Sequence, residues 1–272
     1  MTGSLTIFLI SVFIGGLGSM LGIGGGVFLI PMLTGIIGLP IKTAIGASII
    51  SVIATSTAAG SVYIGKGITH SRLAMILEIA TTMGALAGGI TAVLIDPRWL
   101  AGIFAAVLLY VAYSMGIGFK KQSDGGEKGP GSLVTQYTDP LTQQTVVYGV
   151  RNLKSGMLAS FVAGNISGLL GIGGGVIKVP VMNLIMEIPL RAAIATSNFM
   201  IGITAATSAI IYYQHGYIDP TVAVPTALGI LLGAQIGPRL GGRITSTSLK
   251  RIFSLVLIFF SVIMLIKAFN GS

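Results

Sequence analysis

The chain alternates long apolar runs with short polar turns over most of its length. Six of the runs reach the length of about 20 residues that a helix needs to cross the hydrocarbon core of a bilayer. These runs cover residues 43–65, 73–95, 99–119, 191–213, 220–240 and 248–268. They predict six membrane-spanning helices in two groups of three.

A broken apolar segment precedes each group. Residues 4–37 and 155–186 are apolar throughout, but a glycine cluster interrupts each in the middle and a proline follows. Glycine runs lower helix propensity, so we interpret each segment as a helix of roughly 17 residues, a non-helical turn and a half-length helix running back. Residues 4–21 lack a basic leader and the same pattern recurs internally, so we do not expect a cleaved signal peptide.

The chain also contains one unit twice. The stretch LGIGGGV at residues 21–27 recurs unchanged at residues 170–176. At the same offset Pro31 meets Pro180, and the match continues without a gap through the spanning segments. This internal duplication predicts a first membrane repeat over residues 1–120, a linker over 121–153 and a second membrane repeat over 154–272. Alternating positions on both sides of Asp139-Pro140 predict a short hairpin in the linker.

The basic residues predict how the two copies lie in the bilayer. If each broken segment returns to the side it came from, one face carries twelve Lys and Arg residues and the other carries three, with Lys178 inside the membrane. The larger group is Lys66, Arg72, Lys120, Lys121, Lys128, Arg151, Lys154, Arg191, Arg239, Arg243, Lys250 and Arg251, and the smaller is Lys42, Arg98 and Lys267. If each broken segment crossed the membrane, these residues would divide 8 to 7. The positive-inside rule expects asymmetry, so we predict inverted repeats, a cytoplasmic linker and both termini outside.

The predicted fold class is therefore an all-α polytopic membrane protein. Each of its two inverted-topology repeats has a broken, re-entrant helix pair plus three spanning helices. Composition agrees, because only 8% of the residues are charged and 53% are hydrophobic, with 40 glycines in addition. A soluble enzyme or a nucleic-acid-binding protein of this size needs more charge to cover its surface. The absence of cysteine excludes disulfides and thiolate metal sites.

The glycine clusters are the most specific local signal. No Gly-Lys-Ser/Thr follows them, and a third glycine is missing at the dinucleotide-binding position, so they match neither phosphate-binding fingerprint. A helix that begins at a break inside the membrane directs amide groups and the positive end of its dipole inward, which favours an anion. A structural hinge is the alternative. The predicted substrate-binding residues are Gly22, Gly24, Gly25, Gly26, Ser48, Asn165, Gly171, Gly173, Gly174, Gly175, Lys178, Ser197 and Asn198.

Lys178 is the one full charge predicted near the centre of the bilayer. It lies in the first turn of the second half-helix, where the first copy has Leu29. An ammonium group at that depth costs about 2.5–3.5 kcal/mol and needs a partner or water. No carboxylate lies nearby in the sequence. We expect Glu78 to pair with Arg72 at the cytoplasmic edge, and a proton-coupling role of Glu78 is the alternative. We therefore expect Lys178 either to extend to the membrane surface or bind carbonyl groups freed by the glycine break, or else to supply the counter-charge of an anion.

The paired LGIGGGV-x₃-P element resembles the sulfite exporter TauE/SafE family, and the resemblance covers nearly the whole chain. It implies a transporter that moves sulfur-containing anions such as sulfite, thiosulfate or organosulfonates across the cytoplasmic membrane, mostly outward. The matching residues are Gly22 to Gly26 with Pro31, and Gly171 to Gly175 with Pro180.

Two other classes of function compete with a secondary transporter. The sequence carries no HExxH or GxSxG motif, so we predict that the protein is not an enzyme. A passive anion channel, or a carrier of a non-sulfur organic anion, fits the same glycine breaks. The predicted partners are a small anion and the lipid bilayer; no cofactor, metal or nucleic acid is predicted, and the residues do not define an oligomeric state.

Overall fold

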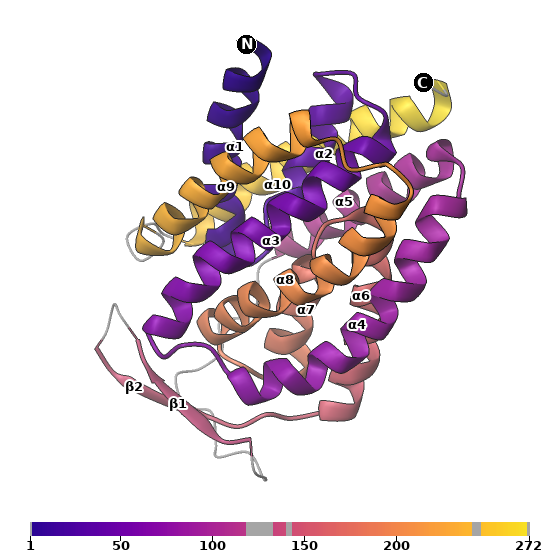
Figure 1. Cartoon of the computed structure of the whole chain (residues 1–272). Helices are drawn as coiled ribbons and strands as arrows, with labels where there is room; N and C mark the ends of the chain where they lie inside the picture. The colour runs from indigo at the N-terminus through magenta and orange to yellow at the C-terminus, as the bar shows by residue number, and fades with distance from the viewer. Residues whose placement is uncertain (1, 118–132, 140–142, 241–245, 271–272) are drawn as a thin grey trace.

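The computed structural model describes residues 2–117, 133–139, 143–240 and 246–270, and helices form most of it (Figure 1). The first copy folds into α1 (Thr2–Leu21), α2 (Gly26–Gly35), α3 (Ile41–Gly65), α4 (Ser71–Leu94) and α5 (Pro97–Ile117). The second copy folds into α6 (Leu153–Leu170), α7 (Gly175–Pro180), the π-helix η1 (Val181–Ile185), α8 (Leu190–Gln214), α9 (Pro220–Leu240) and α10 (Ser246–Asn270). The all-α class is confirmed.

The described helices include five that are long and apolar enough to cross a membrane. They are Ser4–Leu21, Ile41–Gly65, Ser71–Leu94, Leu190–Gln214 and Pro220–Arg239. The helices at Pro97–Tyr113 and Leu257–Phe269 are apolar but shorter. Large apolar side chains such as Phe13, Leu94 and Phe269 are exposed on the outside of the bundle. A multi-pass membrane protein accounts for this exposure, because lipid tails cover such side chains.

Both broken segments are interrupted where the sequence predicts. Residues 22–25 separate α1 from α2, and residues 171–174 separate α6 from α7. The half-helices differ, because α2 continues through Pro31 whereas the second changes to π-helix after Pro180. A π-helix has a wider turn, in which each N–H bonds the carbonyl five residues before it. The bond from the Met186 N–H to the Val181 carbonyl, 3.1 Å long, closes that wider turn.

The two copies are interlocked, since each contributes a helix to the other. The long helix α1 packs on α9 of the second copy, and α6 packs on α4 of the first, whereas α3 pairs with its equivalent α8 and α5 with α10. Glycines at the crossings allow the backbones to touch. A β-carbon on Gly84 would collide with the Phe161 carbonyl, and one on Gly233 would collide with the equivalent Val12 carbonyl. The GALAG stretch at residues 84–88 and the equivalent GAQIG stretch at residues 233–237 are therefore helix-packing motifs.

The linker contains the predicted hairpin. Strand β1 (Thr135–Thr138) pairs antiparallel with β2 (Thr145–Tyr148) in a register that joins Thr135 to Tyr148. Tyr137 and Tyr148 are buried and pack in one cluster with Leu77 of α4 and Met182 and Met186 of the second half-helix. The hairpin is therefore attached to the helix bundle and is more than a tether between the copies.

His70 and Arg191 also connect the hairpin to the helices. The His70 Nδ1 accepts from the Leu73 N–H at 3.4 Å, so its Nε2 carries the proton and donates to the Leu133 carbonyl at 3.1 Å. Burial lowers the pKa of His70, which favours this neutral form. Arg191 forms an ion pair of 3.1 Å with Asp139. These contacts hold the hairpin over the start of α4 and the start of α8.

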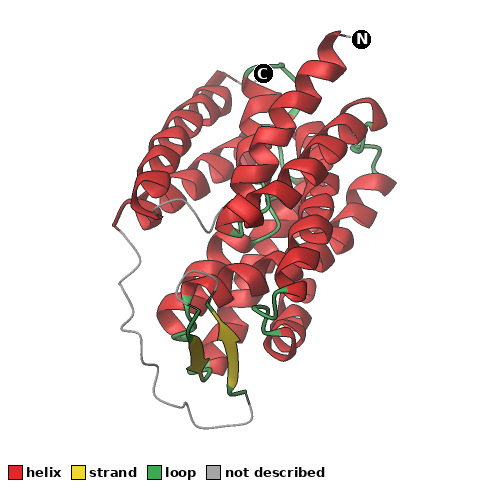
Figure 2. Ribbon diagram, turned by 90° about the vertical axis from the view of Figure 1, so that its left-hand side faces the viewer, coloured by secondary structure: helices red, strands yellow, loops and turns green. Residues whose placement is uncertain are grey.

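Both termini lie at one end of the bundle and the hairpin lies at the opposite end (Figures 1 and 2). An odd number of crossings in each copy requires this arrangement, whereas an even number would bring the hairpin to the same end as the termini. Of the residues that decide the charge asymmetry, Lys120, Lys121, Lys128 and Arg243 lie outside the described residues. The orientation relative to the cytoplasm stays a prediction.

Single cysteines can test that orientation, because the natural chain contains none. Ser4 in α1 and Thr145 in β2 are both exposed and lie at opposite ends. With an impermeant thiol reagent added outside intact cells, we expect labelling of the Ser4→Cys variant and none of Thr145→Cys until the cells are opened. Labelling of Thr145→Cys alone in intact cells would reverse the predicted topology.

Candidate functional site

The glycine clusters adopt the same backbone in both copies. The φ angles are 72°, 84° and 72° at Gly22, Gly24 and Gly25, and 65°, 75° and 71° at the equivalent residues 171, 173 and 174. A side chain in this left-handed region costs roughly 1–2 kcal/mol per residue, so three such positions in four residues require glycine. The repeated motif is therefore a repeated backbone shape, which ends one helix and starts the next.

The two breaks are in direct contact with each other. A β-carbon on Gly26 would lie 3.0 Å from the Gly171 carbonyl oxygen. Its equivalent, Gly175, faces the Gly22 carbonyl so closely that a β-carbon would collide with it. Glycine at both positions therefore allows the two interrupted segments to meet inside the protein.

A serine from each copy bonds the break of the other copy. The Ser48 hydroxyl of α3 donates to the Gly171 carbonyl at 2.8 Å, and the equivalent Ser197 hydroxyl of α8 donates to the Gly22 carbonyl at 2.9 Å. Both serines are fully buried. Each hydroxyl satisfies a carbonyl that the helix break leaves without an intrahelical partner.

Apolar side chains fill the space beside the two turns. A β-carbon on Gly24 would lie 2.9 Å from the Ile201 side chain, and one on Gly173 would lie 2.7 Å from Val52. Val52 and Ile201 are equivalent residues and both are fully buried. The turns face each other across these side chains and not across an open space.

The two predicted asparagines have different positions. Asn198 is fully buried, and its amide donates to the carbonyls of Ser19 at 3.2 Å and Ile194 at 3.0 Å. Its Oδ1 has no hydrogen-bond partner among the described residues. Asn165 is half-buried, and its backbone lies against Gly88 of α4. Asn198 therefore lies beside the breaks, where its amide bonds the end of α1, whereas the Asn165 backbone belongs to the α4–α6 packing contact.

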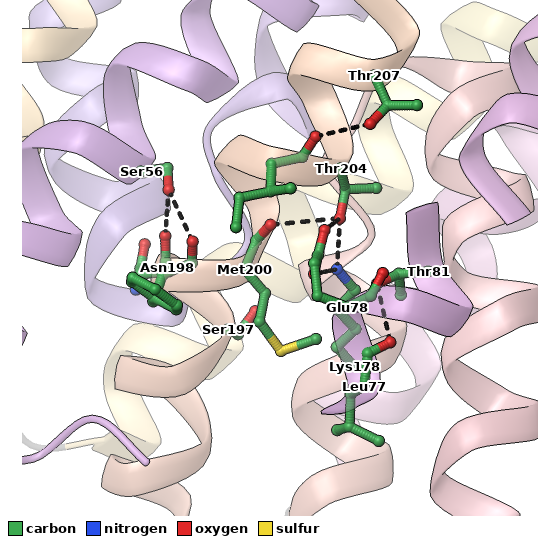
Figure 3. A network of polar contacts seen from close by, with 12 residues as sticks. Ser56, Leu77, Glu78, Thr81, Lys178, Ser197, Asn198, Met200, Thr204 and Thr207 are labelled. Carbon is green, nitrogen blue, oxygen red and sulfur yellow. Dashed lines mark hydrogen bonds and ion pairs between the residues drawn. The ribbon is translucent and has the colours of Figure 1, made fainter. Parts of the chain in front are cut away.

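Lys178 has a carboxylate partner that sequence reasoning missed. Its Nζ lies 3.5 Å from Glu78 Oε2 and donates to the Thr204 hydroxyl at 2.8 Å (Figure 3). That hydroxyl in turn contacts Glu78 Oε1 at 2.6 Å. The side chain of Lys178 is fully buried and that of Glu78 is 8% exposed. The expectation that Glu78 pairs with Arg72 is wrong, because its carboxylate points into the bundle.

The partner was missed because Glu78 and Lys178 come from different copies. Helix α4 packs on α6 and α8, which brings Glu78 to the second half-helix, but the sequence separation hides this contact. The repeat itself does contain a signal. Glu78 aligns with Ala227 and Lys178 aligns with Leu29, so two opposite charges inside apolar segments both depart from the duplication.

The fold and these contacts define a multi-pass membrane protein with interlocked repeats and two touching helix breaks. Comparison with known proteins agrees: the profile of the sulfite exporter TauE/SafE family matches residues 7–264. The chain belongs to this family.

Named relatives cover most of the chain. A probable membrane transporter protein of Bacillus subtilis, YunE, is 24% identical over 90% of both chains. A probable membrane transporter protein of Xylella fastidiosa is 27% identical over 88% of this chain and 86% of its own. The probable membrane transporter protein MJ0441 of Methanocaldococcus jannaschii is 26% identical over 92% and 91%. No solved structure matches the chain significantly.

The serine bonds give a testable account of how the breaks are held. Ser48→Ala and Ser197→Ala each leave a buried glycine carbonyl without a donor, so we expect each to lower the free energy of unfolding by about 1–2 kcal/mol. The measurement is reversible unfolding in detergent micelles. Thr57→Ala is the control, because that exposed hydroxyl bonds only the Ile53 carbonyl of its own helix. Equal stability of all three variants would show that the serines do not hold the breaks.

Proposed function

We propose that this protein is a secondary transporter that exports small sulfur-containing anions, such as sulfite or organosulfonates, across the cytoplasmic membrane. The anion binds between the two glycine breaks. The observation that carries this proposal is the contact between the breaks, with the buried Lys178 ammonium one turn beyond the second break. The linker faces the cytoplasm and both termini face outside.

Local electrostatics support an anion as the cargo. Helix α2 begins at the first break, and α7, continued by η1, begins at the second. The first turns of helices carry positive partial charge, and here the start of each half-helix lies against the break of the other copy. Lys178 adds a buried ammonium group close to the second break, and this group can balance an anion once the Glu78 carboxylate no longer pairs with it. Small oxyanions also suit backbone N–H donors, which bind them through several short hydrogen bonds at once.

The contact between the breaks also supports a carrier. The turns touch and Val52 and Ile201 fill the space beside them, so an anion can enter only when the two copies move apart. The reciprocal serine bonds and glycine contacts make the interface equivalent on both sides. A rocking motion that opens one side or the other costs similar contacts in each direction, as alternating access requires.

The family and its relatives support the class of cargo to different degrees. The relatives carry names of membrane transporters, and the family name refers to sulfite export. Sulfur-containing anions and outward transport therefore come to this chain through its family. The starts of two helices at the breaks support an anion independently of those names.

Flux measurements in proteoliposomes test this function. We expect saturable uptake of sulfite, thiosulfate and isethionate, mutual competition among them, and no competition by organic cations of similar size. An unlabelled anion on the far side should accelerate uptake if the protein is a carrier. Saturation-free flux would indicate a channel, and preference for carboxylates over all sulfur anions would indicate a carrier of a different organic anion.

A matched pair of glycine variants tests where the anion binds. Gly25→Ala and Gly38→Ala both place a side chain at positive φ, but Gly38 lies in a loop with nothing within 4 Å of the added carbon. At Gly25 the added carbon meets Ile14 and Ile230 at 3.4 Å, an ordinary contact. We expect both variants to fold and only Gly25→Ala to weaken thiosulfate uptake, about tenfold or more. Equal uptake by the two variants would argue against a site at the breaks.

A further inference from the structure

Glu78, Lys178 and Thr204 form a buried polar cluster that the proposed anion site alone does not explain. Glu78 comes from α4 of the first copy, and Lys178 and Thr204 come from α7 and α8 of the second. We propose that Glu78 is a proton-binding site coupled to the anion site: it takes up one proton when an anion replaces its carboxylate as the partner of Lys178. This inference rests on the proposed function and names the coupling ion.

The hydrogen bonds around Thr204 suit two protonation states of Glu78. With Glu78 ionised, the Thr204 hydroxyl accepts from Lys178 Nζ and donates to Glu78 Oε1 at 2.6 Å. A second acceptor, the Met200 carbonyl, lies 3.3 Å from the same hydroxyl (Figure 3). With Glu78 protonated, its O–H donates to Thr204 and Thr204 donates to Met200. The hydroxyl therefore keeps a donor and an acceptor in both states.

The contact between the Glu78 carboxylate and the Lys178 ammonium is long. Glu78 Oε2 is buried and has no hydrogen-bond partner among the described residues. It lies 3.5 Å from the ammonium, farther than the about 2.7–2.9 Å of a direct charge-assisted hydrogen bond. An incoming anion that bonds the ammonium directly can compete with such a contact. Lys178 also lies close to the second break, because its backbone N–H bonds the Gly174 carbonyl at 3.0 Å. An anion bound at that break would therefore be near the residue.

Burial then links the proton to the anion. An ionised carboxylate without a cation partner is costly inside a membrane, so Glu78 becomes neutral when the anion takes its place. Conversely, a neutral Glu78 leaves the ammonium unbalanced until an anion arrives. Proton binding to Glu78 therefore favours anion binding at Lys178, and anion binding favours proton binding to the same extent.

No other charged group among the described residues faces this cluster. On α4 itself, Arg72 is exposed, about two turns away towards the helix start. Of the helices packed against α4, α6 carries the exposed Lys154 and α8 carries Arg191, which pairs with Asp139. The charge of Glu78 is therefore balanced by Lys178.

Proton counting on the purified full-length protein tests the inference. Thiosulfate is the probe, because it does not titrate near neutral pH, and the detergent solution contains no sulfonate buffer that could bind as an anion. We expect uptake of about one proton per radiolabelled thiosulfate bound, followed with a pH electrode. Linkage of one proton also predicts that affinity rises about tenfold for each unit of decrease in pH.

Two glutamate variants assign the proton. Glu78→Gln imitates the protonated side chain, so we expect it to bind thiosulfate with no proton uptake and with an affinity that does not change with pH. Glu187→Gln is the matched control, since Glu187 pairs with Arg151 at a half-exposed site and should keep the wild-type proton count. Proton uptake that persists in Glu78→Gln would overturn the assignment.

The outcomes separate this inference from the proposed function. Thiosulfate binding by the wild-type protein without proton uptake would overturn the coupling and leave the anion transporter intact. Failure of folded wild-type protein to bind thiosulfate, sulfite and isethionate alike would overturn both. The wild-type measurement decides the coupling even if the Glu78→Gln variant does not fold.

Discussion

Main-chain polar groups inside a membrane must find partners within the protein, and the two glycine breaks are where this requirement is hardest to meet. Neither copy meets it alone. Ser48 of the first copy bonds Gly171 of the second, and Ser197 of the second bonds Gly22 of the first. The exchange explains why the unit occurs twice: a single copy would leave its own break carbonyl without this donor. It also explains why the glycines are needed, since β-carbons at residues 26 and 175 would push the donors and acceptors apart.

The same exchange governs how the helices pack. Lipid tails are as apolar as leucine, so membrane helices gain little by hiding apolar side chains from lipid and associate instead through close packing. Glycines at the α1–α9 and α4–α6 crossings bring backbones into contact, and these crossings join opposite copies. The packing therefore holds each break against the serine that satisfies it. A change in the packing at these crossings would alter the contacts between the breaks. Motion of whole helices can therefore change the proposed site.

The sequence predicted the parts of this arrangement that local pattern determines. Apolar length located the helices, glycine clusters located both breaks, and the duplication paired Ser48 with Ser197. It did not predict that Val52 and Ile201 would fill the space beside the turns, because side-chain packing between copies leaves no periodic trace. Glu78 was assigned to the wrong partner for a related reason: Arg72 is its neighbour along the helix, whereas Lys178 becomes its neighbour only when α4 packs beside the second half-helix.

The backbones of the two copies are arranged symmetrically, but the buried charges of Glu78 and Lys178 are not. These two features serve different purposes. Thr55 and Thr204 are equivalent residues, yet the Thr55 hydroxyl bonds the Gly24 carbonyl at 3.2 Å whereas the Thr204 hydroxyl bonds Lys178 and Glu78. A two-fold scaffold allows the site to open towards either side with similar contacts. A second lysine at Leu29 would place two ammonium groups in the same apolar interior, and each would need its own counter-ion. One small anion can balance only one of them well. A single ion pair therefore suits the proposed site for one anion, while the backbone around it stays symmetric.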